Sequence, residues 1–254
     1  MNDVDQADKD FLAPYMERLL SMRIDIAAKM WEIRNENILF EGAQGAMLDI
    51  DSGTYPYVSS GASGSYGASS GSGIGPRNLD KIYGVFKAYE TRVGNGPMPT
   101  EFNADSEGEL CDYVRKTGNE FGVTTGRARR CGYLDLVALR YACHVNSIDS
   151  LVLTHLDVYD DMEEIEACVA YDIDGELVTD FPTSIPALNK AKPVLQKFAG
   201  WKQSIKNLSK YSQLPKNAKA YVDFIEDYTG TKVGIVSVGP DRNQTFNREK
   251  IWKK

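Results

Sequence analysis

The sequence predicts an α/β protein, with a largely parallel sheet and flanking helices, in one domain over residues 1–254. Three observations support this prediction. Short continuous apolar runs indicate buried strands, and they alternate with longer segments of helical hydrophobic period. Glycine-marked polar turns follow several of the runs, as they do in α/β folds. With 254 residues, of which 42% are hydrophobic, the chain can bury a sizeable core.

The first part of the chain contains a long apolar repeat. Its members recur at helical spacing and predict one amphipathic helix over residues 9–34: Phe11, Leu12, Tyr15, Leu19, Met22, Ile26 and Met30. The apolar run at 38–40 predicts a buried strand, and the glycines at 41–45 predict a tight turn after it. Residues 80–89 are expected to form a helix, followed by a strand end at 90–94.

The second part of the chain alternates more regularly. Helices are expected over 107–118, 133–145 and 216–228. Buried strands are expected at 151–153 and 233–237, where apolar residues follow one another without interruption. Apolar residues flank the pair Asp174-Gly175, which predicts a hairpin with a type I′ turn.

Residues 59–76 are almost entirely Ser, Gly and Ala. Such a tract is typical of a flexible linker. Its flanks do not resemble domain edges, however, and a Gly/Ser loop inside a domain offers amides and hydroxyls to a phosphate or carboxylate. Composition alone leaves both interpretations open.

Composition excludes several classes of protein. Lys plus Arg is 29 and Asp plus Glu is 36, so the net charge of −7 argues against nucleic acid as a partner. Four cysteines occur without a CxxC pair, which is typical of reduced thiols. No stretch approaches 18 apolar residues, and the acidic start does not resemble a secretory signal. A cytoplasmic protein without a membrane partner is expected.

The loop at 118–130 carries the most distinctive chemistry. Two hydroxyls, Thr124 and Thr125, precede Gly126 and three guanidiniums, Arg127, Arg129 and Arg130. Arginine forks bind two oxygens at once, so this loop predicts a clamp for a carboxylate or phosphate. A solvated charged loop is the alternative.

Polar residues after the apolar runs are further candidates, because ligands gather at the carboxyl ends of parallel strands. The amide of Gln44 could read a purine edge, orient a reacting carbonyl or belong to a turn. Asp157 could accept two hydrogen bonds from guanine or cap a helix. A ligand role for His155 stays open, whereas His144 is expected to be structural. No GxxxxGK[ST] or GxSxG motif occurs.

Six segments resemble adenylosuccinate synthetase, in order and with plausible spacing. They are FEGAQGAMLDIDSGTYPYV at 40–58, GSGIGPR at 71–77, KAYETRVGNGPMPTE at 87–101, GNEFGVTTGRARRCGYLD at 118–135, LTHLDV at 153–158 and SVGPDR at 237–242. The resemblance implies the carboxy-terminal part of an incomplete P-loop-NTPase-like synthetase fold. It also implies a ligase that joins IMP and L-aspartate at the expense of GTP, with Mg²⁺.

The resemblance assigns roles to individual residues. Those implied for IMP, with Gln44 also catalytic, are Gln44, Ser59, Val93 and Arg127. Those implied for aspartate are Thr125, Arg127 and Arg129. Those implied for the nucleotide are Arg129, His155, Asp157, Ser237 and Gly239.

The sequence also departs from the family pattern. The segment with the family's phosphate loop, main catalytic groups and Mg²⁺ ligands has no counterpart in residues 1–38, so no metal ligand is expected in this chain. The chain is therefore expected to be inactive alone and to need a complementary amino-terminal polypeptide. A truncated form of a longer protein and a homo-oligomer also stay open. His155 stands where the family has lysine, which makes ATP conceivable in place of GTP.

Two more functions stay open at this point. One is a non-catalytic nucleotide-binding or regulatory homologue. The second is a relative that uses dGMP and ATP, suggested by His155 and by the drifted segment at 61–66.

Overall fold

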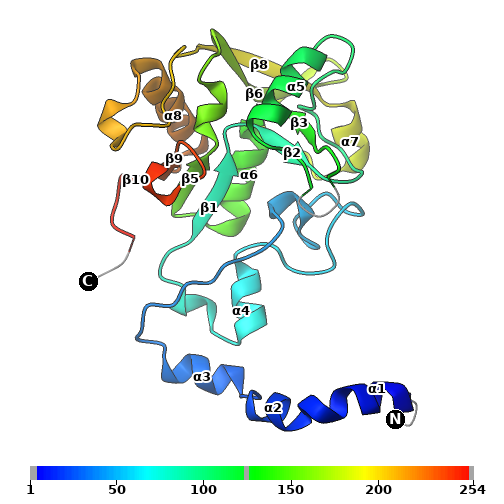
Figure 1. Cartoon of the computed structure of the whole chain (residues 1–254). Coiled ribbons are helices and arrows are strands. Elements are labelled where there is room, and N and C mark those ends of the chain that lie inside the picture. The colour runs from blue at the N-terminus through cyan, green and yellow to red at the C-terminus, as the bar shows by residue number, and fades with distance from the viewer. Residues whose placement is uncertain (1–4, 123–125, 252–254) are drawn as a thin grey trace.

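The computed structural model describes residues 5–122 and 126–251. Figure 1 shows the strands, and the helices that follow residue 80, gathered into one body. The α-helices before residue 80 lie below that body in the figure, and the amino terminus is at the far end of the row. No helix in the described part of the chain is long and apolar enough to cross a membrane.

A four-stranded sheet lies at the centre of the body. It runs in the order β1 (Tyr83–Lys87), β5 (Ser150–Thr154), β9 (Val233–Ser237) and β10 (Thr245–Asn247). The first three strands are parallel and only the edge strand β10 is antiparallel, so the largely parallel sheet is confirmed. The predicted strands at 151–153 and 233–237 are its two inner strands, and most of their apolar side chains are buried.

The helix expected at 80–89 is wrong, because this segment forms β1. It pairs with β5 from Tyr83–Ser150 to Lys87–Thr154. Val85 is exposed on one face of the strand, while Phe86 packs against the core. Pairing with a strand far along the chain therefore decided the structure over the local apolar spacing.

A second sheet is built around the long strand β6 (Glu164–Ile173). β4 (Leu134–Asp135) is parallel to β6, whereas β7 (Glu176–Val178) and β8 (Lys192–Ala199) are antiparallel to it. The predicted hairpin joins β6 to β7, and Asp174 and Gly175 both have positive φ, 55° and 89°, as a type I′ turn requires. The antiparallel pair β2 (Glu90–Arg92) and β3 (Arg130–Gly132) brings the arginine loop beside residues 90–92.

The α-helices that the described residues contribute to this body are α5 (Gly108–Thr117), α6 (Leu136–Asn146), α7 (Ile185–Lys190) and α8 (Lys216–Thr229). The helices expected at 107–118, 133–145 and 216–228 are confirmed, with starts within three residues of those observed. The carboxylate of Asp135 caps α6 by accepting from the Ala138 amide at 3.0 Å. α8 ends at Gly230 with a φ of 68°.

The prediction of one continuous helix over 9–34 is wrong, because the segment is divided into shorter helices. The structure has α1 (Gln6–Leu12), a 3₁₀ turn at Ala13–Tyr15, α2 (Met16–Ser21) and α3 (Ile26–Glu32). Pro14 lies in the 3₁₀ turn and supplies no amide hydrogen, and Asp25 starts α3 by accepting from the Ala28 amide at 3.0 Å. We call residues 5–40 the N-terminal arm.

The apolar side chains of the N-terminal arm are mostly exposed. Among the large apolar residues of α1–α3, only Met30 is buried. The strand expected at 38–40 is also wrong, since no strand forms there and Leu39 is 74% exposed. The apolar pattern was recognised correctly, but within the described chain nothing covers it.

The Gly/Ser segment at 59–76 is folded, and it contains α4 (Tyr66–Ser72). The buried carboxylate of Asp49 accepts from the amides of Ser63 and Gly64, at 2.7 and 2.9 Å, and from the Tyr66 hydroxyl. Ser65 bonds to Asn146, the last residue of α6, through its amide and its hydroxyl. The linker interpretation is therefore wrong, and the amides of this loop bind an anion of the protein itself.

Candidate functional site

Three parallel strands bring candidate residues to one edge of the central sheet. β1 ends at Lys87, whose register partner Thr154 ends β5. His155 follows Thr154 directly, and Ser237 ends the neighbouring strand β9. Parallel strands end on the same side, so these side chains start from a common edge. No strand precedes Gln44, so it does not extend from a strand end as these residues do.

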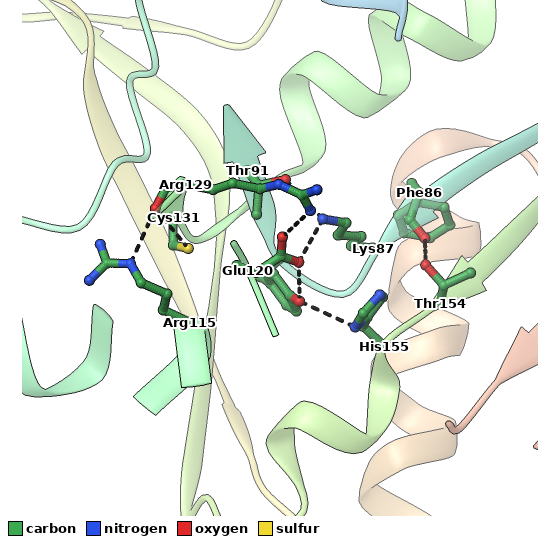
Figure 2. A network of polar contacts seen from close by, with 10 residues as sticks. Phe86, Lys87, Thr91, Arg115, Glu120, Arg129, Cys131, Thr154 and His155 are labelled. Carbon is green, nitrogen blue, oxygen red and sulfur yellow. Dashed lines mark hydrogen bonds and ion pairs between the residues drawn. The ribbon is translucent and has the colours of Figure 1, made fainter. Parts of the chain in front are cut away.

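The buried carboxylate of Glu120 connects this edge to the arginine loop (Figure 2). Its Oε1 accepts hydrogen bonds from Nζ of Lys87 and from the Tyr89 hydroxyl, both at 2.6 Å. Its Oε2 accepts from Nη1 of Arg129 at 2.6 Å. The Tyr89 hydroxyl also lies 3.3 Å from Nδ1 of His155. A continuous chain of polar contacts therefore joins Arg129 to the end of β5.

Burial and charge set the protonation of this network. Burial alone would raise the pKa of Glu120, but the bonds from Lys87, Tyr89 and Arg129 outweigh it and hold that pKa below its usual range. Burial lowers the pKa of His155, and the nearby Lys87 lowers it further. Burial and the bond to Glu120 raise the pKa of Tyr89. At neutral pH the network holds an ionised carboxylate, a neutral imidazole and a protonated phenol.

The arginines of the loop differ in what they contact. Arg130 forms a two-pronged ion pair with Glu101, at 2.8 and 2.5 Å, and donates to the carbonyls of Gly94 and Gly96. It therefore holds the loop. Arg129 contacts Glu120 through one nitrogen and keeps part of its side chain exposed. Arg127 is exposed.

Thr125, expected to contact aspartate, lies outside the described residues. The structure does define the base of its loop. There the Gly122 amide donates to the carbonyl of Arg127 at 2.8 Å, and the Arg129 amide donates to the carbonyl of Glu120 at 3.0 Å.

Three of the residues expected to bind the nucleotide lie around Lys206 and Gln244. Oδ2 of Asp157 lies 3.5 Å from Nζ of Lys206, whose carbonyl accepts from Nε2 of Gln244 at 2.9 Å. The Gln244 side chain lies so close to Gly239 that a Cβ there would meet it at 2.3 Å. The Ser237 hydroxyl donates to the Gly239 carbonyl at 2.9 Å. Asp157, Ser237 and Gly239 thus share one neighbourhood.

Two of the residues expected to bind IMP lie on segments that touch. The Ser59 amide donates to the carbonyl of Leu48 at 2.7 Å. Arg92, beside the exposed Val93, donates to the Tyr57 carbonyl at 2.9 Å. Gln44 is exposed in a left-handed turn, with a φ of 62°, four residues before Leu48. Arg92 therefore holds the backbone around Ser59 against the end of β2.

Comparison with known proteins identifies the family. The family model for adenylosuccinate synthetase matches residues 2–246. The chain belongs to the adenylosuccinate synthetase family. Its members are ligases of purine nucleotide biosynthesis, and the predicted resemblance is confirmed.

Curated relatives extend beyond the matched region. The adenylosuccinate synthetase of Clostridium perfringens is 46% identical over 250 residues, which cover 97% of this chain and 57% of the relative. That of Aquifex aeolicus is 45% identical over 254 residues, which cover 99% of this chain and 56% of the relative. The chain therefore spans less than three fifths of the length of these relatives.

Solved structures confirm the fold. The fully ligated adenylosuccinate synthetase of Plasmodium falciparum matches with a TM-score of 0.90 and 39% identity, over 98% of this chain and 59% of that one. A cyanophage S-2L succinoaminodeoxyadenylate synthetase, bound to dGMP and dATP, matches with a TM-score of 0.53 at 16% identity. The second likeness shows the fold alone.

The residues that join this network together were missed from the sequence. Glu120, Lys87 and Tyr89 all lie within motifs that carry the resemblance, yet only their neighbours were singled out. One available signal was the single carboxylate of Glu120 within an arginine-rich loop. A carboxylate in that position is a natural partner for a guanidinium that has to be held in place.

The described residues do not assemble a metal site. Within residues 5–122 and 126–251, no three His, Cys, Asp or Glu side chains lie close enough together to hold an ion. The expectation that Mg²⁺ ligands come from a segment outside this chain stays a prediction.

Proposed function

We propose that this chain supplies the aspartate-binding and base-binding part of an adenylosuccinate synthetase, which joins IMP and L-aspartate at the expense of GTP. The observation that carries the proposal is the Glu120 network. It ties Arg129, expected to bind aspartate, to His155, expected at the nucleotide base, through contacts of 2.6, 2.6 and 3.3 Å. Two groups expected to serve one reaction are thus held by one buried carboxylate.

On this proposal the arginine loop binds the carboxylates of aspartate. Arg127 and Arg129 are the cations, and Thr125 adds a hydroxyl. Gln44, Ser59 and Val93 line the IMP side, with Gln44 near the purine oxygen that is exchanged. Guanidinium groups stabilise carboxylates through paired, charge-assisted hydrogen bonds, which also orient the attacking amine.

The base of the nucleotide is proposed to lie against Asp157, His155, Ser237 and Gly239. Asp157 is buried, and its ion pair with Lys206 is long at 3.5 Å, so a ligand donor can replace that contact. An ionised carboxylate accepts from the two adjacent N–H donors of guanine, and adenine lacks that pair of donors. GTP is therefore the proposed donor, and ATP is the alternative.

A complementary amino-terminal polypeptide is proposed to complete the enzyme and to bring the phosphate-binding groups and the Mg²⁺ ligands. The exposed apolar face of the N-terminal arm supports this proposal. Its members are more than a third exposed: Phe11, Leu12, Tyr15, Met16, Leu19, Leu20, Met22, Ile24, Ile26, Trp31 and Leu39. An extended apolar surface of this kind is typical of a protein–protein contact. This chain alone is expected to be inactive.

The test is reconstitution. This chain would be mixed with a polypeptide that carries the amino-terminal portion of an adenylosuccinate synthetase, together with IMP, L-aspartate, GTP and Mg²⁺. We expect phosphate release and adenylosuccinate formation by the mixture and by neither component alone. Absence of turnover, with the two polypeptides shown to associate, would contradict the proposal.

A matched pair of variants tests the base-binding part in the same assay. Asp157→Asn is expected to raise KM for GTP by about 10- to 100-fold, because it removes a charged hydrogen-bond acceptor. Asp161→Asn removes the same charge from an exposed position of the same turn and is expected to leave KM unchanged. Equal effects of the two variants would place the nucleotide base elsewhere.

Binding experiments separate this function from the two competing ones. Calorimetry that shows nucleotide binding, with no partner restoring turnover, favours a non-catalytic homologue. Stronger thermal stabilisation by dGMP than by IMP favours a relative that acts on dGMP. A cytoplasmic location stays a prediction, supported by the four free cysteines.

A further inference from the structure

We propose that Glu120 is a positioning residue that presents Lys87 and Arg129 as a pair of cations, and that Lys87 is a further residue binding the substrate anion. The inference rests on the proposed function and deepens it, because neither the motif assignments nor the arginine loop includes Lys87. The ligand is a carboxylate or phosphate group small enough to meet both cations.

The geometry of the Glu120 network is the first argument. Both oxygens of Glu120 are used, Oε1 by Lys87 and Tyr89 and Oε2 by Arg129, each at 2.6 Å. The three donors come from β1, from the residue two positions after it, and from the residue before β3. One carboxylate therefore fixes two cations from separate elements relative to each other.

The second argument is exposure. The side chain of Glu120 is 1% exposed, whereas those of Lys87 and Arg129 are 26% and 30% exposed. Partial exposure spares the two cations much of their desolvation cost and also leaves them open to an anion from solvent. Here the anion is closed off and both cations reach the solvent, as a binding site for a second anion requires.

The third argument is charge and hydrogen-bonding capacity. Two positive charges face one negative charge, so the group keeps a net charge of +1. Among the contacts of the described residues, Nζ of Lys87 donates to Glu120 and to Thr91 at 2.6 and 2.9 Å, which leaves one of its three donors. Among the same contacts, the guanidinium of Arg129 donates once to Glu120, which leaves four of its five donors. An incoming carboxylate or phosphate can thus bind both cations without breaking their hydrogen bonds to Glu120.

The Glu120 network also reaches His155, which is proposed to lie beside the nucleotide base. Tyr89 donates to Glu120 and lies 3.3 Å from the His155 ring, which packs edge-on against it with ring centroids 5.7 Å apart. An anion that binds Lys87 and Arg129 therefore acts on the same Glu120–Tyr89 contact that orients the His155 ring. We expect an anion on Lys87 and Arg129 and a base beside His155 to bind with positive cooperativity.

Anion binding by the full chain tests the proposal without any need for turnover. The probes are succinate, for a carboxylate source, and inorganic phosphate, for a phosphate source, titrated by calorimetry at constant ionic strength. Lys87→Met is expected to weaken binding of at least one probe by about tenfold, and Lys87→Arg to restore it to within about threefold.

Lys81→Met is the matched control. Lys81 precedes β1 at the opposite edge of the same sheet, has a similar side-chain exposure of 29% and pairs with Glu249 at 2.8 Å. Its loss removes the same charge and is expected to change the Kd by less than about twofold. Equal weakening by Lys81→Met and Lys87→Met would overturn the proposal.

Glu120→Gln separates positioning from simple charge. If Glu120 only reduced the local positive charge, its neutralisation would strengthen anion binding. A positioning role predicts weaker binding, by about tenfold, because the two cations lose their common support. Tighter binding by Glu120→Gln, or no binding of either probe by the unsubstituted chain, would overturn the proposal.

The outcome is independent of reconstitution. If both anion-binding tests succeed and no partner restores turnover, the proposed function fails while the cation pair stands. In a reconstituted enzyme, Lys87→Met is expected to raise KM for one anionic substrate with little change in kcat. The Lys87→Arg variant is expected to restore that KM.

Discussion

The N-terminal arm and the central sheet both carry many apolar side chains but bury them to opposite extents. Leu151 and Leu153 of β5 are 1% and 0% exposed, whereas Leu20 and Leu39 of the arm are 58% and 74% exposed. Burial of a leucine side chain contributes about 1.5–3 kcal/mol. The sheet obtains this contribution within the chain, and the arm does not.

The difference in burial shows which region can be stable on its own. The sheet strands are covered by α6 and α8, which contact each other and the second sheet, so that region carries its own core. The arm touches the rest of the described chain mainly where α3 meets α4. Within the described chain its apolar side chains contribute little to stability, and the proposed amino-terminal partner would cover them.

The largest expected effect is in the sheet core. Leu153→Ala should lower the free energy of unfolding by about 2–5 kcal/mol, because it removes buried methyl groups and leaves a cavity. Leu39→Ala, the same substitution in the arm, should change it by less than about 0.5 kcal/mol. Urea unfolding followed by circular dichroism measures both. Similar losses would mean that the arm has a core of its own.

The Gly/Ser segment lies between the two regions and depends on one carboxylate. Asp49→Asn should destabilise it by about 1–3 kcal/mol, because the amides of Ser63 and Gly64 lose an ionised acceptor. Hydrogen exchange of residues 59–76 would report this locally. Asp51→Asn, at an exposed position two residues on, is the control and should leave exchange unchanged.

The effect of Asp49→Asn should also depend on pH. Burial raises the pKa of Asp49, but the hydrogen bonds from Tyr66 and from backbone amides outweigh it and hold that pKa well below its usual range. A depressed pKa contributes stability above the unfolded value of about 3.9, and this is lost as pH falls. The difference between the parent and the variant should therefore be full at about pH 6 and shrink below about pH 4.

Periodicity predicted the parts of the fold whose signal is local. The helix expected at 133–145 was found because its cap and its apolar face lie within one segment. β1 was mistaken for a helix because its strand character comes from pairing with β5, more than sixty residues along the chain. The arm was expected to be one helix because an apolar stripe looks the same whether or not something covers it.

The sequence predicted those site residues that follow the strands of the parallel sheet. His155, Asp157 and Ser237 could be expected together because polar residues after parallel strands meet at one edge. Glu120 could not be placed, since its partners Lys87 and Tyr89 lie 33 and 31 residues before it. Its place in an arginine-rich loop indicates an ion-pair partner, but the sequence does not show that the carboxylate is buried or that it joins Lys87 and Tyr89.

The junction between the arm and the Gly/Ser segment offers a smaller effect. Gly73 ends α4 with a φ of 72°, and a Cβ there would lie 3.1 Å from Cβ of Ala27 in α3. Gly73→Ala should destabilise the junction of α3 and α4 by about 1–2 kcal/mol, because alanine is strained in the left-handed conformation. Gly71→Ala, inside α4 and with open space for a Cβ, should stabilise α4 by about 0.5–1 kcal/mol. Hydrogen exchange in α3 and α4 measures both, and equal signs would contradict the assignment of strain.

The smallest effect on stability is expected where the most apolar surface is exposed. Replacing Phe11, Leu20 and Ile24 by serine should leave the urea midpoint of the sheet unchanged within about 0.5 kcal/mol, because these side chains are already in water. The same variant should bind less of a hydrophobic dye and associate less with itself, because it removes part of the exposed apolar face.

The result of this last variant decides how the two regions relate. An unchanged midpoint with reduced dye binding means that the sheet folds without help from the arm and that the arm's apolar face is kept for a contact. A lower midpoint would mean that these three side chains pack on the sheet in solution. The arm would then be part of the core of this chain, and its exposed face would no longer support a separate partner.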